Sequence, residues 1–208
     1  MGLKPAIHLG SHRFLLSSLA DLNGEAFETV MESLGKRDFD GLAGLLGEYF
    51  SPRRVQVLSS ILSFIGERAE FTSLLADHEG VLYNEELEDL RYLDLLAGSL
   101  EEAGYGDNVR IDLSEIGGQP YYTGIVFRAY LPGLDSEVAS GGRYDKLLAS
   151  FGFDCPSVGF SFMQRKIEHL VEERFGLPEQ IEQVEEKDFL TAFRRAEKLH
   201  SEGRIAKL

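Results

Sequence analysis

The spacing of apolar residues changes near Asn108, and this change constrains the fold more than any other feature of the sequence. From Glu25 to Leu100 apolar residues recur at helical spacing, which predicts a series of amphipathic helices. From Val109 to Ser114 apolar and polar residues alternate, which predicts a β-strand with one solvated face. The apolar run Ala6–Leu9 predicts an earlier strand, followed by a helix at Arg13–Leu22. The sequence therefore predicts an α+β fold with a helical block between two strand-bearing regions.

The region after the first alternating segment predicts further strands with short connections. Tyr121–Leu131 is a long β-rich run, and Glu137–Ser140 can return beside it after a Pro-Gly turn. Two glycines are then expected to open a helix at Arg143–Ser150. Ser157–Phe162 predicts the next strand, which leads into a helix at Gln164–Arg174. Short connections between successive strands favour an antiparallel sheet with helices packed on it.

The C-terminal part of the sequence predicts a separate small element. Pro178–Lys187 is polar and is expected to be a linker, and Asp188–His200 predicts an amphipathic helix. Ile205–Leu208 predicts the start of a strand. Both ends of the sequence look cut within strands, so we expect a piece of a longer protein. The inward face of the last helix is predicted to carry Phe189, Phe193, Ala196 and Leu199.

Charge and cysteine content exclude several classes of protein. The chain has 35 acidic and 21 basic residues, and its net charge of −14 argues against a surface built to hold nucleic acid. The single cysteine, Cys155, rules out an internal disulfide and a multi-cysteine metal site, and it fits a reduced, cytoplasmic setting. No apolar run approaches the roughly 18 residues that a membrane helix needs. We therefore expect neither a membrane nor a nucleic-acid partner.

The densest signal for a functional site combines glycines, tyrosines and arginines between Gly117 and Lys166. A single glycine in a strand most simply marks a bulge or turn, but several beside aromatic and basic residues favour a small-molecule pocket. Strand alternation predicts that Tyr121 and Tyr122 point to opposite faces, so that only one lines the site. An arginine paired with a nearby carboxylate is the alternative for Arg143. The candidate binding residues are Tyr121, Tyr122, Gly124, Gly141, Gly142, Arg143 and Tyr144.

Other chemical signals are weaker. His8 and His12 are four residues apart, but His8 lies in a predicted strand and no third metal ligand is close in sequence, so a structural role is favoured. No base is placed near Cys155 by spacing, and a packed or incidental thiol is favoured over a nucleophile. We predict no catalytic residue, no metal site and no cofactor.

Three ordered blocks of the sequence resemble the catalytic core of the histidyl-tRNA synthetase family. They are YYTGIVFRAY at Tyr121–Tyr130, SGGRYDKLL at Ser140–Leu148 and PSVGFSF at Pro156–Phe162. The resemblance covers Ala6 to about Arg174. It implies a class II aminoacyl-tRNA synthetase-like fold, an antiparallel sheet flanked by helices, in which the first block is the histidine-binding strand.

The resemblance also implies a domain organisation. Residues 1–176 would form a partial class II core, in which a helical insertion at about 25–80 matches the family only loosely. Residues 177–208 would form a linker and the start of a C-terminal α/β domain, because Ala192–Ala206 resembles the opening of the family's anticodon-binding domain. The upstream class II motifs, which carry the family's dimer interface and most ATP contacts, are absent from these residues.

Two positions depart from the synthetase pattern. Gly117 stands where the family has an arginine four residues before the Tyr-Tyr pair, and a glycine supplies no positive charge to a reacting anion. Lys166 stands where the last class II motif has an ATP-binding arginine, and Arg165 lies one residue early. A lysine is a point charge rather than a planar fork, so it substitutes poorly.

This combination resembles the family's non-catalytic branch, the regulatory subunits of ATP phosphoribosyltransferase. It implies a regulatory, non-enzymatic protein that complexes with a short catalytic subunit in the first step of histidine biosynthesis and senses histidine. A homo-oligomer is implied for the full-length chain. A histidyl-tRNA synthetase fragment, which would activate histidine with ATP, and a stand-alone small-ligand binding module are the alternatives.

Overall fold

The computed structural model describes residues 4–116, 119–171, 181–184, 188–202 and 204–207. The chain divides into two compact units, Met1–Phe162 and Met163–Leu208. Each unit has its own sheet and its own helices. The domain boundary predicted at residue 176 falls outside the described residues.

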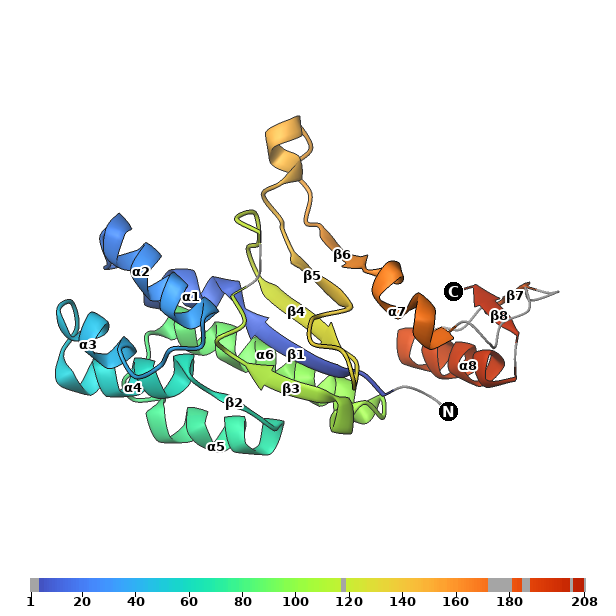
Figure 1. Ribbon diagram of the computed structural model, residues 1–208, viewed down its shortest axis with the longest axis horizontal. Helices are drawn as coiled ribbons and strands as arrows, with labels where there is room; N and C mark the ends of the chain where they lie inside the picture. The colour runs from blue at the N-terminus through green and yellow to red at the C-terminus, as the bar shows by residue number, and fades with distance from the viewer. Residues whose placement is uncertain (1–3, 117–118, 172–180, 185–187, 203, 208) are drawn as a thin grey trace. The chain divides into compact units, whose positions relative to one another are not determined.

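The first unit is built on a six-stranded sheet in the order β2-β3-β1-β4-β5-β6 (Figure 1). The predicted α+β class is confirmed, but the sheet is mixed, because β1 and β3 run parallel whereas every other neighbouring pair is antiparallel. The helical block between β1 and β3 supplies the long crossover that a parallel pair requires. The strands are β1 Ala6–Ser11, β2 Ile65–Gly66, β3 Val109–Asp112, β4 Ile125–Tyr130, β5 Ala139–Arg143 and β6 Val158–Phe162.

Helices α1, α5 and α6 of the first unit contact the sheet, and α6 runs along β1 and β3 (Figure 1). Local signals explain where helices begin: the Ser11 side chain accepts a hydrogen bond from Phe14 N at the start of α1, and Ser51 caps α4 with proline in its first turn. The helices are α1 His12–Ser18, α2 Gly24–Gly35, α3 Leu42–Gly47, α4 Pro52–Leu62, α5 Arg68–His78 and α6 Asn84–Glu102, with short 3₁₀ helices at Gly106–Asn108 and Leu148–Phe151.

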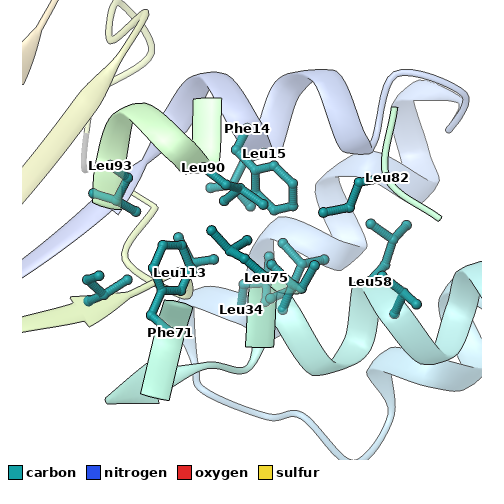
Figure 2. Close-up of a cluster of buried hydrophobic side chains, with 14 of the residues drawn as sticks. Phe14, Leu15, Leu34, Leu58, Phe71, Leu75, Leu82, Leu90, Leu93 and Leu113 are labelled. Carbon is teal, nitrogen blue, oxygen red and sulfur yellow. The ribbon is translucent and has the colours of Figure 1, made fainter. Parts of the chain in front are cut away.

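One hydrophobic cluster joins these helices to the sheet. Phe14 of α1, Leu58 of α4, Phe71 of α5, Leu90 of α6 and Ile111 of β3 belong to it and are fully buried. Figure 2 shows most of these side chains converging between the helices. Burying one such side chain stabilises the fold by about 1.5–3 kcal/mol, so the predicted helical stripes are core residues.

Three predicted elements of the first unit are wrong in detail. The helix predicted at Arg143–Ser150 does not form: Arg143 ends β5, and only a 3₁₀ turn follows at Leu148–Phe151. Tyr121–Leu131 is a strand only from Ile125 to Tyr130. The predicted all-helical block contains β2, because Ile65 and Gly66 pair with Asp112 and Ile111 at the sheet edge. Strand pairing overrides local propensity at β2 and at Arg143, whereas residues 121–124 take no part in the strand pairing.

The second unit contains α7 Gln164–Val171, β7 Ile181–Gln183, α8 Phe189–Ser201 and β8 Ile205–Lys207. The predicted last helix and last strand are confirmed, but part of the predicted linker is a strand, since β7 pairs in parallel with β8. Ala196 and Leu199 are buried as the helical spacing predicts, and Leu199 packs in one cluster with Val184 and Ala192. The prediction that Phe189 faces inward is wrong. Its side chain is 70% exposed, and its ring stacks on that of Phe193.

Among the described residues, no helix has both the length and the apolar character needed to cross a membrane.

Candidate ligand-binding site

Three tyrosines form a cluster where the chain enters β4 and leaves β5. The ring centroids of Tyr121 and Tyr122 lie 5.2 Å apart, and the Tyr144 ring lies 5.5 Å and 6.4 Å from them. Tyr122 is buried, whereas Tyr121 is 37% exposed. The predicted strand alternation does not separate these two side chains, because both residues precede β4, and both rings reach Tyr144.

Glycines in β5 and β6 provide the flat surface on which the cluster rests. An ideal Cβ on Gly142 would lie 2.7 Å from the Tyr122 ring and 2.8 Å from the carbonyl oxygen of Ile125. A Cβ on Gly159, which pairs with Gly142, would collide with the Tyr144 hydroxyl. The predicted close approach to these glycines is therefore made by the protein's own tyrosines.

A pocket of about 220 Å³ opens beside the tyrosines. It combines aromatic rings with hydroxyl and amide groups, which is the lining of a site for a small polar ring. The volume lies below the range of drug-sized pockets, and it suits a molecule the size of an amino acid. The lining residues are Gln119, Tyr121, Tyr122, Ser140, Tyr144, Gly159, Phe160 and Ser161.

A row of polar residues crosses the same face of the sheet beside this pocket. His8, Arg128, Ser140 and Ser161 are successive cross-strand partners, and the last two line the pocket. Arg128 Nε lies 3.1 Å from Oε1 of Glu115, whose side chain is 3% exposed. Burial raises the pKa of Glu115, and the Arg128 charge opposes that rise. Arg128 and Glu115 therefore form a partly buried ion pair close to the tyrosine pocket.

Asp112 anchors the far end of this row. Its fully buried carboxylate accepts hydrogen bonds from His8 Nδ1 at 2.8 Å, Arg37 Nη2 at 2.6 Å and Ser114 Oγ at 2.6 Å. Burial alone would raise the pKa of Asp112, but these three donors outweigh it and lower the pKa. The predicted structural role of His8 is therefore confirmed as a partner of Asp112.

The predicted site residues do not all gather at one place. Tyr121, Tyr122, Gly142 and Tyr144 lie together, but strand alternation places Gly141 and Arg143 on the opposite face of β5. Gly124 also lies there, because a Cβ on it would contact the Arg143 side chain. Arg143 Nε donates to both oxygens of Asp145 at 2.9 Å and 2.8 Å, which is the paired-carboxylate alternative.

Neither of the two positions that depart from the synthetase pattern can be placed in this cluster. Gly117 lies outside the described residues. Lys166 lies in α7, in the second unit. Within the described residues, no group of three His, Cys, Asp or Glu side chains could hold a metal ion. Sequence reasoning missed Glu115 and Asp112, since 104 residues separate Asp112 from His8 and no local spacing signals that pairing.

A mixed sheet with one helix-covered face and one face bearing the tyrosine pocket defines a class II aminoacyl-tRNA synthetase-like core. The family model described as histidyl-tRNA synthetase matches residues 3–167. The chain belongs to the histidyl-tRNA synthetase family.

Curated relatives carry a more specific name. An ATP phosphoribosyltransferase regulatory subunit from Clostridium kluyveri is 28% identical over an alignment covering 100% of this chain and 57% of the relative. Further relatives carry the same name, which confirms the resemblance to this branch. The chain spans about half the length, or less, of the curated relatives it matches.

Solved structures share the fold. An ATP phosphoribosyltransferase regulatory subunit/histidyl-tRNA synthetase from Bacillus halodurans has a TM-score of 0.68 at 23% identity, covering 98% of this chain and 54% of that one. An ATP phosphoribosyl transferase (HisG:HisZ) complex from Thermotoga maritima has a TM-score of 0.54 at 17% identity, covering 78% of this chain and 55% of that one. At these identities the likeness concerns the fold.

Proposed function

We propose that this chain is part of a regulatory subunit of ATP phosphoribosyltransferase, which supports the first step of histidine biosynthesis without being an enzyme itself. The observation that carries the proposal is that curated regulatory subunits match this chain along its whole length. The tyrosine pocket would then sense histidine rather than activate it. Like other enzymes of amino-acid biosynthesis that use soluble substrates, the complex would work in the cytoplasm.

The composition of the pocket supports binding without chemistry. Tyr122 is buried and hydrogen-bond capable, and burial together with Tyr121 and Tyr144 raises its pKa, so its hydroxyl keeps its proton at neutral pH. The sequence has Gly117 where the synthetase resemblance implies an arginine. A pocket that holds an amino acid but lacks this cation cannot stabilise the charge that develops during activation by ATP.

The partner in this proposal is a short catalytic subunit of ATP phosphoribosyltransferase. The complex from Thermotoga maritima shares the fold of this chain and is a precedent for such an assembly. Histidine would be the ligand, and the full-length chain would form a homo-oligomer.

Mixing the full-length protein with a short catalytic subunit tests the proposal. We expect a rise in the rate of phosphoribosyl transfer and a complex of larger mass, and we expect histidine to reverse the activation. An unchanged rate with no complex would contradict the proposal.

A histidyl-tRNA synthetase fragment is the second candidate, favoured by the description of the family model. Histidine-dependent exchange of ATP and pyrophosphate by the full-length protein distinguishes the two. We expect no exchange above background, and measurable exchange would replace the regulatory proposal with the synthetase.

Calorimetric titration with histidine tests the pocket directly. Tyr122→Phe and Tyr144→Phe remove hydroxyls at the pocket and should weaken histidine binding by about tenfold each, the worth of one hydrogen bond. Tyr83→Phe is the matched control, because Tyr83 is 60% exposed on the helical lobe. No heat with the unaltered protein, or equal affinity in all variants, would remove histidine from this pocket.

A further inference from the structure

A second pocket lies on the opposite face of the sheet from the tyrosines. It has a volume of about 260 Å³ and lies between the start of α1, the middle of α6 and the ends of β4 and β5. Its walls carry charge of both signs, from Arg13, Glu88, Asp89, Arg143 and Asp145. Gly124 and Arg143 belong to the predicted histidine-binding set, but the structure places them here, away from the tyrosines. Arg13, Glu88 and Asp89 belong to no block that resembles the synthetase family.

Asp89, which lines this pocket, has a carboxylate oxygen without a hydrogen-bond donor in the part of the chain that the structure describes. Its side chain is only 8% exposed, and Oδ1 lies 3.1 Å from Nε of Arg13, which is itself 60% exposed. The other oxygen, Oδ2, is buried and accepts no hydrogen bond from any described residue. A buried carboxylate oxygen without a donor lowers the stability of the fold, because its hydrogen bonds to water are lost and no protein hydrogen bond replaces them.

The surroundings of Asp89 favour a positively charged ligand group. Burial raises the pKa of Asp89, and the Glu85, Glu88 and Glu86 carboxylates raise it further, against the lowering effect of Arg13. Glu88 also lines the pocket, so two carboxylates of α6 border the same space, with Asp145 on the β-strand side. An ammonium group placed there would face both carboxylates and balance their negative charge.

The β-strand side of the pocket carries the Arg143 guanidinium together with the Asp145 carboxylate that pairs with it. Arg143 uses Nε for Asp145 and also hydrogen-bonds the Tyr92 side chain, but its side chain is 41% exposed and its five N–H donors leave some for a ligand. Gly124 lines the pocket beside it, and a Cβ there would lie 3.1 Å from the Arg143 side chain. The glycine therefore leaves room for this arginine at the pocket wall.

We propose that this pocket binds a small α-amino acid as a zwitterion, with the ammonium group at Asp89 and Glu88 and the carboxylate at Arg143. The two charges of such a ligand match the two charged walls, and its size matches the volume. This site is separate from the tyrosine pocket. It does not depend on the regulatory function proposed above.

Thermal unfolding of the full-length protein in the presence of each common L-amino acid other than histidine, at millimolar concentration, tests the proposal. We expect at least one amino acid to raise the melting temperature. The corresponding amine, which lacks the carboxylate, should bind at least tenfold more weakly in a calorimetric titration. Failure of every amino acid to shift the melting temperature would overturn the proposal.

Variants locate the binding. Asp89→Asn and Arg143→Gln should each reduce the affinity at least tenfold, whereas Tyr122→Phe should leave it unchanged. Arg143→Gln alters a partly exposed residue, so it keeps the test open if Asp89→Asn does not fold. Asp38→Asn is the control for a lost surface carboxylate, since Asp38 is exposed. Binding that only Tyr122→Phe abolishes would assign the ligand to the tyrosine pocket and overturn this proposal, while leaving the regulatory function intact.

Discussion

Gly142 shows at the scale of one residue how the candidate site is held. Gly142→Ala should push the Tyr122 ring off the sheet, because the new Cβ would lie 2.7 Å from that ring and 2.8 Å from the Ile125 carbonyl oxygen. We expect a loss of about 1–3 kcal/mol in the free energy of unfolding and weaker histidine binding. Denaturant unfolding and calorimetry measure the two effects.

Gly44→Ala is the matched control for that substitution. Gly44 lies in α3, and nothing lies within 4 Å of the position that an alanine Cβ would take, so alanine should be neutral or stabilising there. If both substitutions change the free energy of unfolding and the histidine affinity equally, the close contact between Gly142 and the Tyr122 ring has no special role.

Asp112 makes the stability of the fold depend on pH. Its pKa is lowered in the folded state by hydrogen bonds that outweigh burial, so its stabilising effect is present above the ordinary aspartate pKa of about 3.9. As the pH falls below that value towards the lower folded pKa, the contribution is lost. Asp112→Asn should cost about 3 kcal/mol at neutral pH, because His8 and Arg37 lose their anion.

Denaturant unfolding from pH 7 to pH 2.5 measures this effect. The variant should lose less stability than the unaltered protein over the acidic part of the range, and the exposed Asp38→Asn should follow the unaltered protein. If stability falls with pH equally in Asp112→Asn and the unaltered protein, Asp112 is not the source of the acid-dependent loss of stability.

At the scale of elements, α4 and α6 are joined by a buried ion pair. Arg54 Nη1 donates to Glu86 at 2.8 Å, and the side chains are 7% and 1% exposed. The Arg54 guanidinium also lies 4.4 Å from the Tyr83 ring centroid, but its Nε has no hydrogen-bond partner among the described residues. The ion pair therefore links the two helices, although Arg54 Nε makes no hydrogen bond to a described residue.

Breaking this pair should cost more than replacing it. Glu86→Leu leaves a buried arginine uncompensated, so we expect a loss of about 3–5 kcal/mol in the free energy of unfolding. Adding Arg54→Met should recover at least half of that loss, because both charges are then gone. A double variant that loses the sum of the two single losses would contradict this account.

The elements also show what sequence reasoning can reach. The helices α2, α3, α4 and α6 follow from apolar spacing, because each buries one stripe in a shared core. No such stripe marks α5, which buries only Phe71 and Leu75. The helix predicted at Arg143–Ser150 fails because Gly142 and Arg143 pair with β6 residues that lie further along the chain. Tyr121, Tyr122 and Tyr144 could be singled out from the density of glycines and aromatic residues in this stretch of sequence. The neighbouring ion pair could not, because Arg128 and Glu115 meet only once β4 has docked beside β1.

At the scale of the whole molecule, a net charge of −14 should make stability depend on salt. Like charges repel one another across the folded surface, and about 0.15 M salt shortens the range of that repulsion to about 8 Å. We therefore expect the melting temperature to rise by a few degrees between low and physiological salt. A melting temperature that falls with salt would show that surface ion pairs dominate instead.

The placement of β1 between β3 and β4 governs the order in which the sheet can be assembled. His8 and its partner Asp112 are separated by 104 residues, so β1 leaves the ribosome long before either neighbour exists. The intervening helices can fold from local contacts during that interval and shorten the effective loop that must close. The speed of translation through residues 109–130 should therefore set how long β1 stays unpaired before it pairs with β3 and β4.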